Sequence, residues 1–95
     1  MEKRNVYMER LEENLTGFNT KLDEMKAKAA EFQDDMLAEF LSQLRNLEIN
    51  RDDFVEKYRQ LKKSRGPAWD DVKVGTEKTW SVLKESIDKA VSRFM

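Results

Sequence analysis

The sequence predicts an all-α protein in which a long helix and a shorter C-terminal helix form a helical hairpin, a coiled coil that dimerises into a helical bundle. Three observations lead to this prediction. Apolar residues recur at alternating steps of three and four, the spacing of one helix face that packs on another. The 95 residues include only three glycines and one proline, so there is little material for turns. One cluster of turn residues, at 64–67, divides the single domain into two helical segments.

The first segment is predicted to be one continuous helix over about residues 3–63. Its apolar residues occupy heptad positions a and d as far as Met36. Two consecutive steps of four come next, through Phe40 to Leu44, and such a stutter locally unwinds a supercoil. The alternative is a break near Asn50, because acidic residues come after Asn50 as they often do after a helix N-cap.

The turn is predicted at residues 64–67. Gly66 suits the left-handed backbone conformation found just after a helix end, and Pro67 suits the first turn of a new helix. The second helix is therefore expected over about residues 68–94. Its first turn contains Asp70 and Asp71, which interact favourably with the positive end of the helix dipole.

The helix lengths indicate a partner. At about 1.5 Å per residue the first helix is roughly 90 Å long and the second roughly 40 Å, so a folded-back second helix covers only half of the first seam. We expect an antiparallel homodimer whose long helices cross near residues 32–37. A monomeric three-helix bundle with a break near Asn50 is the competing arrangement, and parallel dimers or larger bundles are the remaining alternatives. The expected oligomer interface is the uncovered part of the seam: Met8, Leu11, Leu15, Phe18, Leu22, Met25, Phe32 and Met36. The residues expected to pack the hairpin are Phe40, Leu44, Leu47, Phe54, Tyr58, Leu61, Trp69, Val72, Trp80, Leu83 and Ile87.

The composition excludes several kinds of site. The chain has no cysteine and no histidine, which excludes disulfides, thiolate nucleophiles and Cys/His zinc sites. Its net charge of −1, from 18 basic and 19 acidic residues, argues against nucleic acid as a partner. We find no signal peptide and no apolar run of the roughly 20 residues that span a bilayer, so we expect a cytoplasmic protein. The chain also lacks a nucleophile–base pair, a phosphate loop or a metal-ligand spacing, so we expect no enzymatic activity and no cofactor.

Two clusters of like charge have a functional and a simpler interpretation. The acidic cluster could share a divalent metal, but helical metal sites of this kind also use histidine, so a solvated acidic face is favoured. The basic cluster could bind anionic lipid or nucleic acid, but compensation of the helix dipole is favoured. The acidic cluster contains Glu31, Asp34, Asp35 and Glu39, and the basic cluster contains Lys57, Arg59, Lys62, Lys63 and Arg65.

Three further residues stand out on the apolar faces. Arg51 occupies a seam position, where it either fixes the register of the helices or packs its stem and extends its charge to solvent. Trp69 and Trp80 are three turns apart on one face. This spacing favours core packing over anchoring in a membrane interface, because the second helix lacks the cationic bias of a membrane-surface helix.

Residues 66–94 also carry a motif. It reads Gly66-Pro67-Ala68-Trp69-Asp70-Asp71-Val72-Lys73, then Gly75-x-Glu77-Lys78-x-Trp80-x-x-Leu83-Lys84, and ends with Ala90-x-Ser92-Arg93-Phe94. The motif resembles the C-terminal helix of a group of small bacterial coiled-coil domain-containing and stress-response proteins, which pair it with a long charged helix. Arg65 and Pro67 depart from the usual Ser-Gly-acidic-Ala-Trp turn of that group. The resemblance implies a bacterial protein connected with stress or envelope upkeep, and it supplies no catalytic or binding residue.

Together these patterns predict a non-catalytic structural or interaction protein that self-associates through its heptad seams and that could also dock on a helix of a different protein. The alternative is a peripheral lipid- or membrane-binding protein that opens its hairpin and lays its amphipathic helices on a bilayer.

Overall fold

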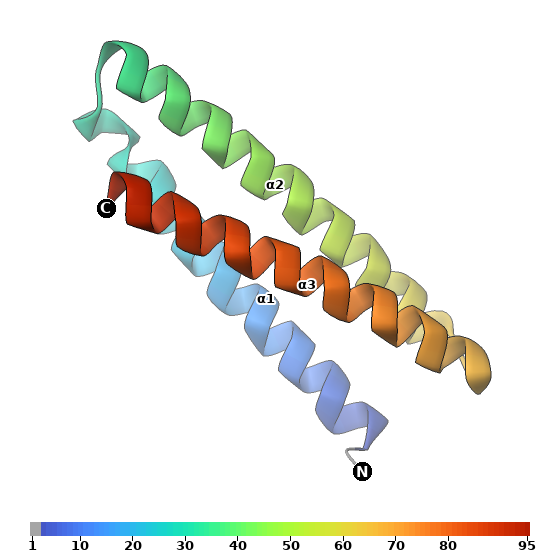
Figure 1. The fold of residues 1–95 in the computed structure, drawn as a ribbon. Coiled ribbons are helices and arrows are strands. Elements are labelled where there is room, and N and C mark those ends of the chain that lie inside the picture. Colours follow the sequence, from blue (N-terminus) through green and yellow to red (C-terminus); the bar gives the residue numbers. More distant parts are fainter. Residues whose placement is uncertain (1–2) are drawn as a thin grey trace.

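The structure, a computed structural model, describes residues 3–95 as three α-helices joined by short connections (Figure 1). Helix α1 comprises Arg4–Ala27, a 3-10 turn η1 comprises Lys28–Glu31, α2 comprises Asp34–Lys63 and α3 comprises Pro67–Phe94. The residues described contain no β-strand. The bundle is elongated, with principal extents of 51 × 18 × 18 Å.

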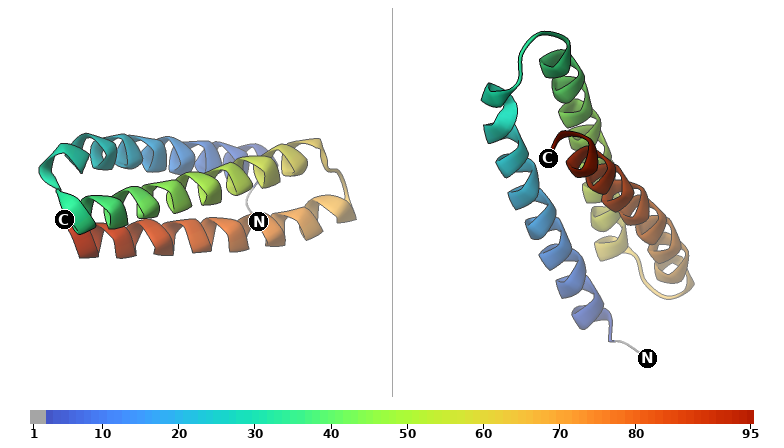
Figure 2. Two further views of the ribbon diagram at one scale, coloured as in Figure 1. Left: turned by 90° about the horizontal axis from the view of Figure 1, so that it is seen from above. Right: turned by 60° about the vertical axis from the view of Figure 1, so that its left-hand side comes forward.

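The three helices run alternately up, down and up (Figure 2). Helices α2 and α3 form the closest pair along their length, and α1 packs on α2 more sparsely. The side-chain contacts agree with this topology at both ends of the bundle. The rings of Phe32 and Phe94 lie 5.7 Å apart at one end, and the Arg4 guanidinium donates a 2.8 Å hydrogen bond to the Lys62 carbonyl at the other.

The expected continuous helix over residues 3–63 is wrong, because the chain reverses direction at residues 28–33. Helix α1 ends at Ala27, and Phe32 and Gln33 are extended, with φ values of −106° and −137°. The chain does not break at Asn50, which lies within α2. The chain therefore forms three helices, as in the competing arrangement, but the break lies at residues 28–33.

Two features explain the break: the acidic start of α2 and the apolar surface that the reversal buries. Asp34 takes a φ of 55°, a left-handed conformation that Asp tolerates better than most residues other than glycine. Asp34 and Asp35 then form the first turn of α2, where the helix dipole favours acidic side chains. Reversal lets α1 bury Leu22 and Met25 within the chain, and each such side chain contributes about 1.5–3 kcal/mol. These gains outweigh the few backbone hydrogen bonds that the reversal removes.

The core follows the axis of the bundle and takes residues from all three helices. At the end nearest the α1–α2 connection, the rings of Phe32, Phe40 and Phe94 pack together with centroids 4.6–5.7 Å apart. Further along, the ring of Phe54 lies 5.3 Å from that of Trp80. The buried apolar residues are Tyr7, Leu11, Phe18, Leu22, Met25, Phe40, Leu44, Leu47, Phe54, Leu61, Leu83, Ile87 and Ala90.

The second connection lies at Ser64–Gly66. Gly66 has a φ of 59° and a ψ of −138°, a conformation in which a side chain would be strained. Pro67 occupies the first turn of α3, and the Trp69 amide donates a 3.0 Å hydrogen bond to the Gly66 carbonyl. This turn places α3 against α2 and brings Trp69 to the end of the bundle where α1 begins.

Candidate interaction surface

The residues expected to form an oligomer interface lie mostly inside the chain. Four of them are buried in the core, three are partly buried against it, and Met36 is 40% exposed. The premise that this seam needs a second chain to cover it is therefore wrong, because the reversal at residues 28–33 covers it with α2 and α3. The buried four are Leu11, Phe18, Leu22 and Met25, and the partly buried three are Met8, Leu15 and Phe32.

The residues expected to pack the hairpin lie in or against the same core. Seven are buried and four are partly buried. The buried residues are Phe40, Leu44, Leu47, Phe54, Leu61, Leu83 and Ile87, and the partly buried residues are Tyr58, Trp69, Val72 and Trp80.

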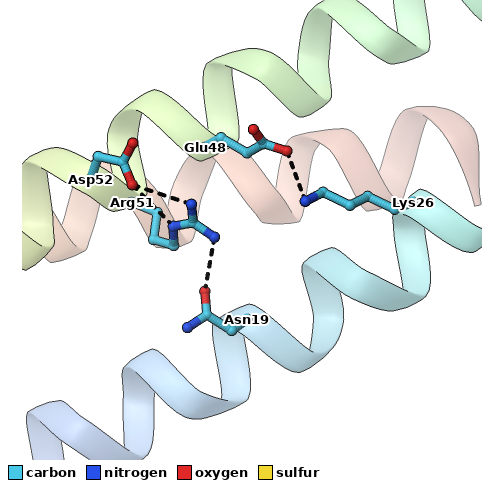
Figure 3. Close-up of polar contacts among 5 residues, drawn as sticks. All are labelled: Asn19, Lys26, Glu48, Arg51 and Asp52. Carbon is cyan, nitrogen blue, oxygen red and sulfur yellow. Dashed lines mark hydrogen bonds and ion pairs between the residues drawn. The ribbon is translucent and has the colours of Figure 1, made fainter.

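Polar contacts connect α1 to α2 along one edge of their interface (Figure 3). The guanidinium of Arg51 donates hydrogen bonds to Asn19 Oδ1 on α1, at 3.4 Å, and to Asp52 Oδ1 on its own helix, at 3.2–3.3 Å. Lys26 Nζ lies 2.9 Å from Glu48 Oε1. The partly exposed charge of Arg51 thus bridges two helices, and a role in fixing the register of the helices stays a prediction.

A cluster of aromatic and cationic side chains joins the start of α1 to the start of α3. The rings of Tyr7 and Trp69 meet edge to face, with centroids 5.8 Å apart. Lys73 Nζ lies 4.5 Å from the Tyr7 ring centroid, and the Arg4 guanidinium carbon lies 5.7 Å from the Trp69 ring centroid. The Tyr7 hydroxyl donates a 3.1 Å hydrogen bond to Glu77. This cluster holds the N-terminal end of α1 on the bundle.

The two clusters of like charge lie at opposite ends of α2. Among residues 3–95 no group of three or more carboxylates lies close enough to hold a metal ion, and from the acidic cluster only Glu39 has a cation from another helix beside it, Arg93.

In the basic cluster, Arg59 pairs with Glu56 at 3.9 Å. The Arg4 guanidinium also donates to the carbonyls of Leu61 and Lys62, so it caps the C-terminal end of α2.

Side-chain contacts between helices shift the pKa values of Glu39 and Tyr58. The Arg93 guanidinium, which hydrogen-bonds the Glu39 carboxylate, lowers the pKa of Glu39 from its ordinary value. Burial, together with a hydrogen bond from its hydroxyl to Glu12, raises the pKa of Tyr58 to about 12. Both shifts follow from packing between helices and require no ligand.

A hollow of about 460 Å³ lies between α1 and α3. Its floor includes Phe18, Trp80 and Ile87, and its rim carries charged residues of both signs. Gly17 lies at its edge, and a Cβ atom added there would meet nothing within 4 Å. This surface is not predicted by the sequence pattern, in which Gly17 and its charged neighbours resemble the solvated side of any helix. The rim residues are Glu13, Lys21, Lys84 and Asp88.

No protein-family model, curated protein or solved structure matches this chain. The resemblance of residues 66–94 to small bacterial stress-response proteins therefore stays an expectation. Among residues 3–95, every helix is too short or too polar to cross a bilayer.

Proposed function

We propose that this chain is a non-catalytic interaction protein that acts as an intact three-helix bundle and self-associates as an antiparallel homodimer. The apolar seam is occupied by the chain's own core, so the dimer forms through the outer surface of the folded bundle. A connection with stress is expected only from the resemblance of residues 66–94.

The observation that carries this proposal is the uneven covering of α1. Helix α2 has close neighbours on two sides, whereas among residues 3–95 the backbones of α1 and α3 make no close approach to each other. The hollow between them, with Phe18 and Trp80 in its floor, is the position that a further helix takes when three helices become four. A helix from a second copy completes this side of the bundle.

The test is the mass and shape of the protein in solution, by light scattering and small-angle X-ray scattering from about 10 μM to about 1 mM, the range in which weak dimers form. A side-by-side dimer doubles the mass at high concentration while the longest dimension stays near the 51 Å of one bundle. A mass of one chain over the whole range contradicts self-association.

A second function, binding to an anionic lipid surface, is favoured by the connection between α1 and α2. Phe32 and Gln33 are extended and interrupt the helix, so a separation of α1 from the α2–α3 pair would take place at this segment. The motion would expose Phe18, Leu22 and the ring of Trp80 as an amphipathic surface. Vesicles containing phosphatidylglycerol should then shift the tryptophan fluorescence to the blue, and an unchanged spectrum contradicts lipid binding.

A further inference from the structure

We propose that two copies associate through α1, antiparallel, about a two-fold axis at Gly17, with ion pairs from Glu13 to Lys21 and from Arg10 to Glu24 across the interface. The proposal rests on the self-association proposed above and names the surface that performs it.

The surface is a stripe along the outer flank of α1. Its residues succeed one another at steps of three and four, which places them on one face of a helix. All of them are exposed, and the face lies beside the hollow between α1 and α3. The stripe consists of Arg10, Glu13, Gly17, Thr20 and Glu24, with Lys21 at its edge.

When two copies of the stripe lie antiparallel and cross at Gly17, the charges of one copy face opposite charges of the other. A two-fold axis at this residue pairs each position with the one equally far on its other side. Glu13 precedes Gly17 by four residues and Lys21 lies four residues after it. Arg10 precedes it by seven and Glu24 lies seven after it. Each pair has opposite signs, and the symmetry forms each pair twice.

The same charges disfavour a parallel dimer in register. There each residue meets its own copy, so Glu13 meets Glu13 and Lys21 meets Lys21. Like charges that face each other across a helix interface are unfavourable and select against that orientation. The stripe therefore specifies both the surface and the antiparallel direction.

No contact among residues 3–95 explains a glycine at position 17. It lies in the middle of α1, where glycine weakens a helix, and a Cβ atom at this position would meet nothing within 4 Å. At the crossing point of two helices, the missing side chain allows the closest approach of the two backbones. The partner's helix then covers the apolar floor of the hollow beside it, where Phe18 and Trp80 lie.

The test uses two charge reversals and their mixture. In the dimer of Glu13→Lys, a lysine faces a lysine at each of the two pairs. In the dimer of Lys21→Glu, a glutamate faces a glutamate at each pair. Each variant should therefore raise the dissociation constant of the dimer at least about tenfold. An equimolar mixture of the two variants restores opposite charges at both pairs. The mixture, and the double variant with both reversals, should dimerise within about threefold of the unaltered chain.

The control is Asp23→Lys, a reversal of the same size on an exposed residue of α1 outside the stripe. It should leave the dissociation constant unchanged. Circular dichroism and the urea midpoint check that every variant folds. Added salt should weaken the dimer of the unaltered chain, because its ion pairs are exposed.

The outcomes separate this interface from self-association in general. If the unaltered chain dimerises but both reversals dimerise equally well, the interface at Gly17 is wrong and the proposed function stands. If the single variants are monomeric and their mixture is monomeric too, the two-fold pairing is wrong. If the unaltered chain is monomeric up to about 1 mM, both proposals fail.

Discussion

The guanidinium of Arg93 donates two hydrogen bonds to the carboxylate of Glu39, from Nε to Oε1 at 2.5 Å and from a terminal nitrogen to Oε2 at 3.0 Å. This two-point contact joins the last turn of α3 to the first turns of α2, beside the three packed phenylalanine rings. It fixes how the C-terminal end of the chain lies on the bundle.

This contact makes the free energy of unfolding depend on pH in the acidic range, where stability falls as the pH falls. Because Arg93 lowers the pKa of Glu39 in the folded state, the unfolded state binds this proton first as the pH falls. The stabilisation is complete above the ordinary carboxyl pKa of about 4 and is lost as the pH falls through the lowered value. Glu39→Gln should therefore lower the urea midpoint at neutral pH and have little effect in acid. Glu31→Gln, whose partner Lys28 is 3.6 Å away on an exposed face, serves as the control. An equal effect of Glu39→Gln at both pH values contradicts the prediction.

Tyr58 makes the free energy of unfolding depend on pH in the alkaline range, where stability falls as the pH rises. The folded-state pKa of Tyr58 is raised from 10.0 to about 12 by burial and by Glu12, so its contribution is complete below the unfolded value and is lost as the pH rises through the folded one. The phenolate absorbance of the folded chain should therefore include the late titration of Tyr58. Glu12→Gln should move this titration part of the way back, because burial is the larger cause. A Glu12→Gln chain with an unchanged titration would show that Glu12 does not act on this hydroxyl.

Trp69 has a buried indole nitrogen, Nε1, with no hydrogen-bond partner among residues 3–95. Replacing the indole by a phenyl ring removes an unsatisfied donor and keeps an aromatic ring near Tyr7. Trp69→Phe should change the free energy of unfolding by less than about 1.5 kcal/mol. Trp69→Ala leaves a cavity and should cost about 3–5 kcal/mol. Urea unfolding measures both, and equal losses for the two variants would mean that the indole nitrogen is satisfied in solution.

Two glycines should respond to alanine in opposite directions. Gly66 has a φ of 59° in the α2–α3 turn, so Gly66→Ala strains the backbone and should cost about 1–3 kcal/mol. Gly75 lies in the middle of α3 with open space around a Cβ atom, so Gly75→Ala should stabilise the protein by about 1 kcal/mol. Thermal unfolding of the two variants compares them directly. A loss of stability in Gly75→Ala would reveal a close neighbour that a single bundle lacks.

The α2–α3 pair was predictable from the sequence because its signals are local. Gly66 and Pro67 have backbone preferences that few other residues share, and the apolar residues after them keep one helical period. The break at residues 28–33 carries no such signal, since the segment contains neither glycine nor proline. Ala29 and Phe32 even preserve the heptad spacing of a continuous helix. The backbone of Phe32 is extended, but its ring packs in the core, so its apolar character gives no sign of the break.

The candidate surface was hidden for a different reason. The hollow combines the flank of α1 with that of α3, and a linear sequence does not reveal that these flanks are neighbours. A continuous helix over residues 3–63 would have placed Gly17 far from Trp80 of its own chain. Only the reversal at residues 28–33 brings Gly17 near Trp80. Because the sequence does not predict this reversal, it does not predict the surface either.

The order of the helices in space has a kinetic consequence. Each close pair of helices consists of neighbours along the chain, α1 with α2 and α2 with α3, and the connections are short. Such a topology has low contact order, because little loop entropy is lost before the first contacts form. The chain can therefore refold within microseconds to milliseconds and spend little time with its apolar faces uncovered.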